Sequence, residues 1–79
     1  MNIQELEKRL IEINIPKDAY SILYDGLPNE RYCITKSHNI WEVYYSERGS
    51  KSGLKTFHDE GSACQYFFNM IEKYAKYNK

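Results

Sequence analysis

The chain has 79 residues, 28% of them charged, and its basic and acidic residues balance to a formal net charge of zero. This length predicts one small domain, residues 1–79, and the neutral balance argues against a strong electrostatic nucleic-acid binder. The charge is uneven: residues 1–30 carry six acids and three bases, net minus three, and residues 31–79 carry five acids and eight bases, net plus three.

The opening segment, MNIQELEKRL, is polar and amphipathic rather than a signal peptide, and no apolar run is long enough to cross a membrane. We therefore expect a cytoplasmic protein that has no membrane partner. The two cysteines, Cys33 and Cys64, fit a reducing compartment in which both stay as thiols.

The first predicted element is a helix over Asn2–Asn14. Its apolar residues recur at helical spacing, namely Ile3, Leu6, Leu10 and Ile13, with Ile11 beside them. Asn2 is placed to cap this helix, and Glu5 follows three residues later, as in a capping box. Pro16 ends the helix because the residue before a proline avoids helical geometry.

Three extended segments follow, each separated from the next by turn residues. The first strand is predicted over Ala19–Tyr24 and the second over Arg31–Lys36, on either side of the turn Asp25–Asn29. The third strand is predicted over Ile40–Glu47, after the turn Ser37–Asn39.

The part of the chain after the third strand is predicted as a polar loop over Arg48–Gly53. A short extended piece, Leu54–Phe57, adds a fourth edge strand if it pairs. Asp59 is expected to cap a second helix, with Glu60 near the positive end of its dipole. The apolar stripe of this helix should lie across the sheet and consists of Ala63, Tyr66, Phe67, Met70, Ile71 and Tyr74.

This order predicts an α+β fold, a two-layer sandwich of helix, three or four antiparallel strands, and helix. Two registers fit the second and third strands, one with Cys33 opposite Val43 and the other with Tyr32 opposite Val43. In both registers Trp41, Val43 and Tyr45 share one face, which we expect to face the core. The opposite face, expected to be free, carries Glu42, Tyr44 and Ser46.

No arrangement of residues in the sequence indicates catalysis. The cysteines and histidines lack the close pairs of a zinc site, and the isolated glycines match no phosphate-binding pattern. We therefore predict that the protein is not an enzyme and uses no metal or other cofactor. A small enzyme that relies on Cys33 or Cys64 is the third-ranked hypothesis.

The tyrosines are the most distinctive feature of the composition. The chain has eight, and five of them lie between Tyr20 and Tyr45 together with the only tryptophan. A core this small cannot bury them all, and exposed tyrosines are typical of protein interfaces. Edge tyrosines that simply cover a thin sheet explain the pattern equally well. Acids beside them, as Asp25 is beside Tyr24, would suit a basic partner.

The element order also fits a double-stranded RNA-binding module. Such domains reach phosphates through lysines at the start of the second helix, where this chain has the acidic run Asp59-Glu60-Gly61-Ser62. Nucleic-acid binding is therefore the alternative hypothesis, and we do not expect nucleic acid as a partner.

A resemblance to a known family is carried by three segments, YSILYDGLPNERYCI, WEVYYSERGSKSGLKTF and ACQYFF, within residues 16–70. They resemble small bacterial immunity proteins of polymorphic-toxin and contact-dependent growth inhibition systems. The most specific parts are GLPNE at 26–30, Tyr32-Cys33 and WEVYYSERG at 41–49. The resemblance implies a non-enzyme that binds a cognate toxin domain, often a nuclease, and neutralises it by stoichiometric protein–protein interaction.

We accordingly expect an inhibitor that is a monomer or weak dimer when free. Its acids would pair with basic residues of the toxin and its tyrosines would act as anchors. The expected toxin-binding residues are Tyr24, Asp25, Asn29 and Glu30 around the first turn, and Glu42, Tyr44, Glu47 and Arg48 on the third strand and its end.

Overall fold

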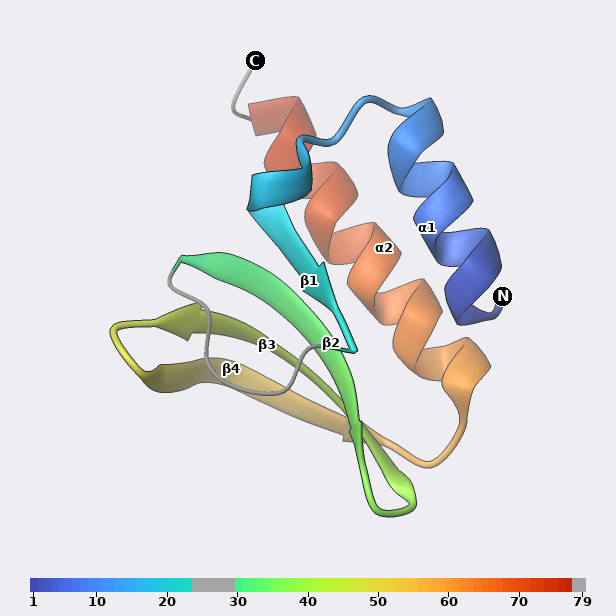
Figure 1. Cartoon of the computed structure of the whole chain (residues 1–79), viewed down its shortest axis with the longest axis vertical. Helices are drawn as coiled ribbons and strands as arrows, with labels where there is room; N and C mark the ends of the chain where they lie inside the picture. The colour runs from blue at the N-terminus through green and yellow to red at the C-terminus, as the bar shows by residue number, and fades with distance from the viewer. Residues whose placement is uncertain (24–29, 78–79) are drawn as a thin grey trace.

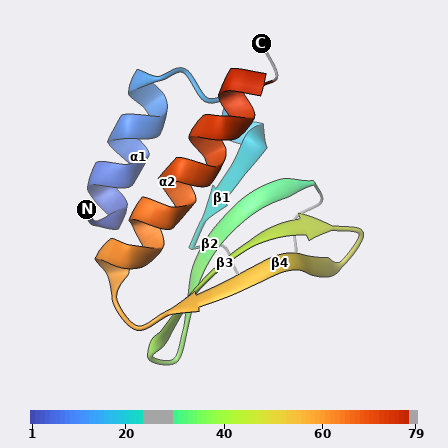
Figure 2. The same ribbon diagram turned by 180° about the vertical axis from the view of Figure 1, so that it is seen from behind.

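The structure is a computed structural model that describes residues 1–23 and 30–77. In chain order its elements are α1 (Ile3–Glu12), a 3-10 turn η1 (Lys17–Ala19), β1 (Tyr20–Ile22), β2 (Arg31–Ser37), β3 (Ile40–Glu47), β4 (Ser50–Phe57) and α2 (Glu60–Tyr77). The strands form one sheet in the order β1-β2-β3-β4, and α2 lies across one face of it with α1 alongside (Figures 1 and 2). The predicted α+β sandwich is confirmed.

The two helices begin at the same end of the molecule and are capped there as predicted. The Asn2 side chain accepts a hydrogen bond from the backbone N–H of Glu5 at 2.8 Å, and the Asp59 carboxylate accepts one from Ser62 at 2.8 Å. The Glu60 carboxylate reaches across to accept a bond from the Ile3 N–H at 2.8 Å. These acceptors satisfy N–H groups that a helix start leaves without an internal partner.

The core lies between α2, α1 and the near face of the sheet. Each fully buried aliphatic side chain of such a core contributes about 1.5–3 kcal/mol to the free energy of unfolding, relative to an exposed one. Its buried members are Leu6, Leu10, Ile15, Tyr20, Ile34, Trp41, Val43, Ala63, Cys64, Phe67 and Ile71. The predicted stripe of the second helix therefore packs on the sheet, although its last member, Tyr74, is 37% exposed.

The pairing of β2 with β3 follows neither predicted register. Ile34 lies opposite Val43, and the hairpin closes through the pair Ser37 and Ile40. The turn therefore has two residues rather than three, with His38 in the left-handed region at φ 58°. The prediction that Cys33 lies opposite Val43 is wrong: Cys33 pairs with Tyr44, so it lies on the face away from the helices.

The first strand differs most from the prediction. It covers only Tyr20–Ile22 and runs parallel to β2, with Tyr20 beside Tyr32 and Ile22 beside Ile34. The sheet is therefore mixed rather than antiparallel. Because parallel strands start at the same edge, the first residues of β1 and of β2 lie at one end of the sheet (Figure 1).

The loop predicted over Arg48–Gly53 is instead a tight hairpin and part of a long strand. Arg48 and Gly49 both have positive φ, 50° and 78°, which is the type I′ pattern that matches strand twist. Gly53, at φ 64°, lies where one extra residue of β4 enters the ladder between the Tyr45 and Val43 pairs. A β-bulge with a left-handed glycine therefore keeps β4 paired.

Candidate functional site

A pocket of about 180 Å³ lies at the end of the sheet where β1 and β2 begin. We call it the tyrosine pocket; it is lined by Pro16, Asp18, Ala19, Glu30, Tyr32, Tyr45 and Tyr74. These residues come from the segment before β1, the start of β2, the end of β3 and the last turns of α2, and they line one pocket together. The parallel pairing of β1 is what brings Asp18 to this end.

The ring of Tyr32 contacts the other two tyrosine rings of the pocket. Tyr32 and Tyr45 are direct partners across β2 and β3, with ring centroids 4.8 Å apart and planes at 61°. Tyr74 approaches Tyr32 from α2, with centroids 5.4 Å apart at the same angle. Each edge-to-face pair of this kind is worth about 0.5–1.5 kcal/mol. The cluster thus gives the pocket a wall fixed by packing.

The charges around these rings are acidic. Burial raises the pKa of Tyr45, and the carboxylates of Glu30 and Glu47 raise it further. Burial also raises the pKa of Tyr32, so both rings are neutral phenols at pH 7. Among the residues that the structure describes, none donates a hydrogen bond to Asp18, Glu30 or Glu47, and none forms an ion pair with them. These carboxylates are available to a partner.

The predicted toxin-binding residues are divided by the structure. Three of them, Tyr24, Asp25 and Asn29, lie outside the described residues. Glu30 lines the tyrosine pocket. Glu47, like Glu30, raises the pKa of Tyr45. Arg48 is exposed in the adjacent hairpin turn.

Glu42 and Tyr44 lie on the other side of the sheet, in a group we call the far-face cluster, which consists of Cys33, Glu42, Tyr44, Ser46 and Lys51. The prediction that Tyr44 and Ser46 are free is wrong: Tyr44 is 2% exposed and Ser46 is fully buried. Burial raises the pKa of Tyr44 to about 12, and the neighbouring Cys33 adds to the shift. The Ser46 hydroxyl has no hydrogen-bond partner within the described part of the chain.

Lys51 contacts two members of the far-face cluster, Tyr44 and Glu42. Its ammonium lies 4.9 Å from the centroid of the Tyr44 ring and 3.0 Å from a carboxylate oxygen of Glu42. Glu42 is therefore already paired within the chain, whereas Glu30 and Glu47 have no ion-pair partner among the described residues. The face assignment of Glu42 and Tyr44 is right, but neither side chain is a free surface group.

The sequence-based list omits Asp18, Tyr32, Tyr45 and Tyr74. Tyr45 is predicted to face the core; it does share a face with Val43 but is only half-buried. The pairing of Tyr32 with Tyr45 would have followed from the correct hairpin register. The placement of Asp18 had no such signal, because it depends on the direction of a three-residue strand.

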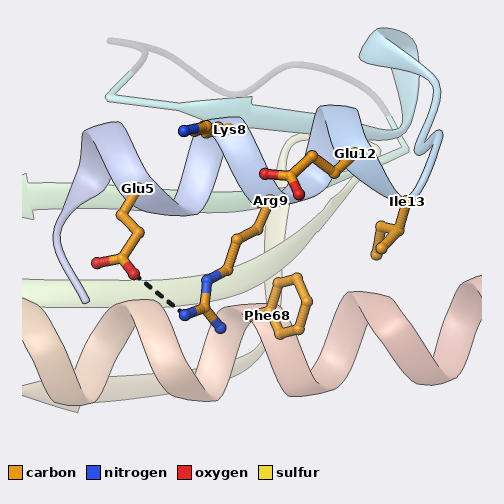
Figure 3. A pocket seen from close by; sticks show the side chains of 6 residues that line it. All are labelled: Glu5, Lys8, Arg9, Glu12, Ile13 and Phe68. Carbon is orange, nitrogen blue, oxygen red and sulfur yellow. Dashed lines mark hydrogen bonds and ion pairs between the residues drawn. The ribbon is translucent and has the colours of Figure 1, made fainter.

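A second, larger hollow of about 480 Å³ lies between α1 and α2 and is lined by Glu5, Lys8, Arg9, Glu12, Ile13 and Phe68. Figure 3 shows Arg9 extending from α1 toward α2 beside Phe68, with its guanidinium 3.1 Å from Glu5. Two acids and two bases of α1 line it, so it presents no single sign of charge to a ligand. We regard it as the weaker candidate site.

The cysteines show no sign of activation. Both are buried free thiols, and burial raises the pKa of Cys33 and raises that of Cys64 to about 11. A nucleophilic cysteine needs the opposite shift. Across residues 1–23 and 30–77, no group of three or more His, Cys, Asp or Glu side chains is arranged to hold a metal ion.

Comparison with models of known protein families, with curated proteins and with solved structures found no match. In the described part of the chain, no helix has the length and apolar character needed to cross a membrane.

Proposed function

We propose that this protein is a cytoplasmic, non-enzymatic inhibitor that binds a cognate bacterial toxin domain in a one-to-one complex. A nuclease is the toxin that we favour. The observation that carries the proposal is the tyrosine pocket, where aromatic rings meet carboxylates that are unpaired among the described residues. The sequence resemblance to small immunity proteins supports the same function.

The chemistry of the pocket suits a basic partner. Nucleases bind phosphate through lysine and arginine side chains. An inhibitor that presents acids to those side chains speeds encounter and neutralises the charges that the substrate would use. Tyrosine supplies contact area with little loss of conformational freedom, which is why it is common among interface hot spots.

The test is co-expression of the protein with the product of the neighbouring gene, followed by pull-down with the tagged chain and native mass spectrometry. The expected result is rescue of growth and a one-to-one complex. Glu30→Lys combined with Glu47→Lys should abolish rescue while leaving the circular dichroism spectrum unchanged. The matched control, Glu7→Lys combined with Glu12→Lys, reverses two exposed acids of α1 and should rescue as well as the wild type.

Nucleic-acid binding is the outcome that would replace this proposal. It would appear as a salt-dependent shift of labelled duplex RNA, with no protein captured. The start of α2, where double-stranded RNA-binding domains place phosphate-binding lysines, here holds Asp59 and Glu60, both engaged as helix-capping acceptors.

A further inference from the structure

We propose that the tyrosine pocket binds one cationic side chain, an arginine, of the protein that this chain binds. The inference rests on the proposed function and names the chemical group that the site recognises. It is drawn from the size of the pocket, the arrangement of its rings and the sign of its charges.

The volume of the pocket limits its occupant. Sites for drug-sized ligands and cofactors typically measure about 300–1,000 Å³, and this pocket measures about 180 Å³. That space suits one side chain rather than a nucleotide or a cofactor. Interface hot spots commonly consist of a single anchoring side chain in a desolvated pocket of this kind.

The rings select for a cation. A guanidinium or ammonium group is attracted to the negative face of an aromatic ring within about 6 Å of its centroid. The ring planes of Tyr32 and Tyr45 meet at 61°. The two rings are therefore not stacked face to face, and their faces point in different directions. Tyr74, the most exposed of the three, stands at the pocket on the α2 side.

The carboxylates add the matching charge. Asp18 and Glu30 are the charged residues that line the pocket, and both are acidic. They enter from different segments, one before β1 and one before β2, so they approach an occupant from separate positions. Arginine is favoured over lysine because its planar guanidinium can stack on a ring while its N–H groups donate to carboxylates.

The experiment uses the full chain and a defined probe. The aromatic ring signals of Tyr32, Tyr45 and Tyr74 are followed by NMR during titration with Nα-acetyl-arginine amide. The comparison probe is Nα-acetyl-citrulline amide, which has nearly the same shape and no charge. We expect saturable shifts with an apparent Kd of about 1–10 mM for the arginine probe and none for citrulline.

Two variants sharpen this titration. Glu30→Gln removes one charge from the pocket and should weaken arginine binding about tenfold. Glu12→Gln removes an acid of α1 that does not line the tyrosine pocket and should leave the titration unchanged. Equal shifts with citrulline, no saturable shift up to about 100 mM arginine probe, or equal loss in both variants would each overturn the inference.

Failure of the pocket assignment and failure of the proposed function give different results. If the pocket binds the arginine probe but the chain captures and neutralises no toxin, the function fails and the pocket assignment stands. If a one-to-one toxin complex forms and Tyr45→Ala and Glu30→Gln bind the toxin as tightly as the wild type, the function stands and the pocket inference fails.

Discussion

The two tyrosines that follow each other on β3 belong to two regions with different surroundings. Tyr44 is enclosed in the far-face cluster, where Glu42 is paired with Lys51. Tyr45 forms part of the tyrosine pocket, where the nearby Glu30 and Glu47 are unpaired within the described residues. Both regions combine aromatic rings with acids. Residue type alone therefore does not separate the two regions, whereas the ion pairs already formed among the described residues do.

The largest contrast should be in stability. Tyr44→Ala removes a buried aromatic side chain, which costs about 3–5 kcal/mol. A single core in a domain of this size rarely supplies more than about 3–5 kcal/mol, so the variant should be mostly unfolded at 25 °C. Tyr45→Ala removes a half-buried ring and should cost about 1–2 kcal/mol. Urea unfolding followed by circular dichroism measures both, and equal losses would contradict the assigned burial.

The next contrast is the response to alkaline pH. The folded state raises the pKa of Tyr44 from its ordinary value near 10.0 to about 12, so folding favours the neutral phenol. That contribution is complete below pH 10 and is lost as the pH rises from 10 to 12. The free energy of unfolding should therefore fall over this range, less steeply in Tyr44→Phe than in the wild type.

Tyr45→Phe is the control for this pH series. Burial raises the pKa of Tyr45 as well, but the larger shift is at Tyr44, so Tyr44→Phe should flatten the curve more. Superimposable curves for the wild type and Tyr44→Phe would mean that the Tyr44 phenol is not held neutral by the fold.

The smallest contrast concerns the acids of β3. Glu42→Lys breaks the pair with Lys51, separated by 3.0 Å, and places two cations together, which should cost about 1 kcal/mol. Glu47→Lys breaks no pair within the described residues and should change stability by less than about 0.5 kcal/mol. Thermal unfolding of the two variants measures the difference, and a larger loss for Glu47→Lys would reverse the assignment.

Much of the framework is readable from the sequence because its signals are local. The caps at Asn2 and Asp59, the apolar stripe of α2 and the core-facing side of Trp41 and Val43 all follow from spacing along one element. The burial of Tyr44 cannot be predicted in this way. Alternation along a strand separates two faces but does not tell which of them is covered.

The tyrosine pocket depends on information that is not local. Its composition requires that β1, a strand of three residues, pairs parallel to β2, and so short a segment carries no signal of direction. An antiparallel β1 would place Asp18 at the opposite end of the sheet from Glu30. Glu30 could therefore be named from the sequence, while the pocket that joins it to Asp18 could not.

The central claim is that Glu30 and Glu47 beside Tyr45, which are unpaired among the described residues, bind the toxin, and that the paired Glu42 beside Tyr44 does not. Its most direct test is isothermal titration calorimetry of the purified toxin domain against the wild type, Glu30→Lys combined with Glu47→Lys, and Glu42→Lys. The account predicts one-to-one binding that weakens about 100-fold in the double variant and less than about threefold in Glu42→Lys. Equal affinity of the double variant and the wild type, or a greater loss in Glu42→Lys, would contradict it.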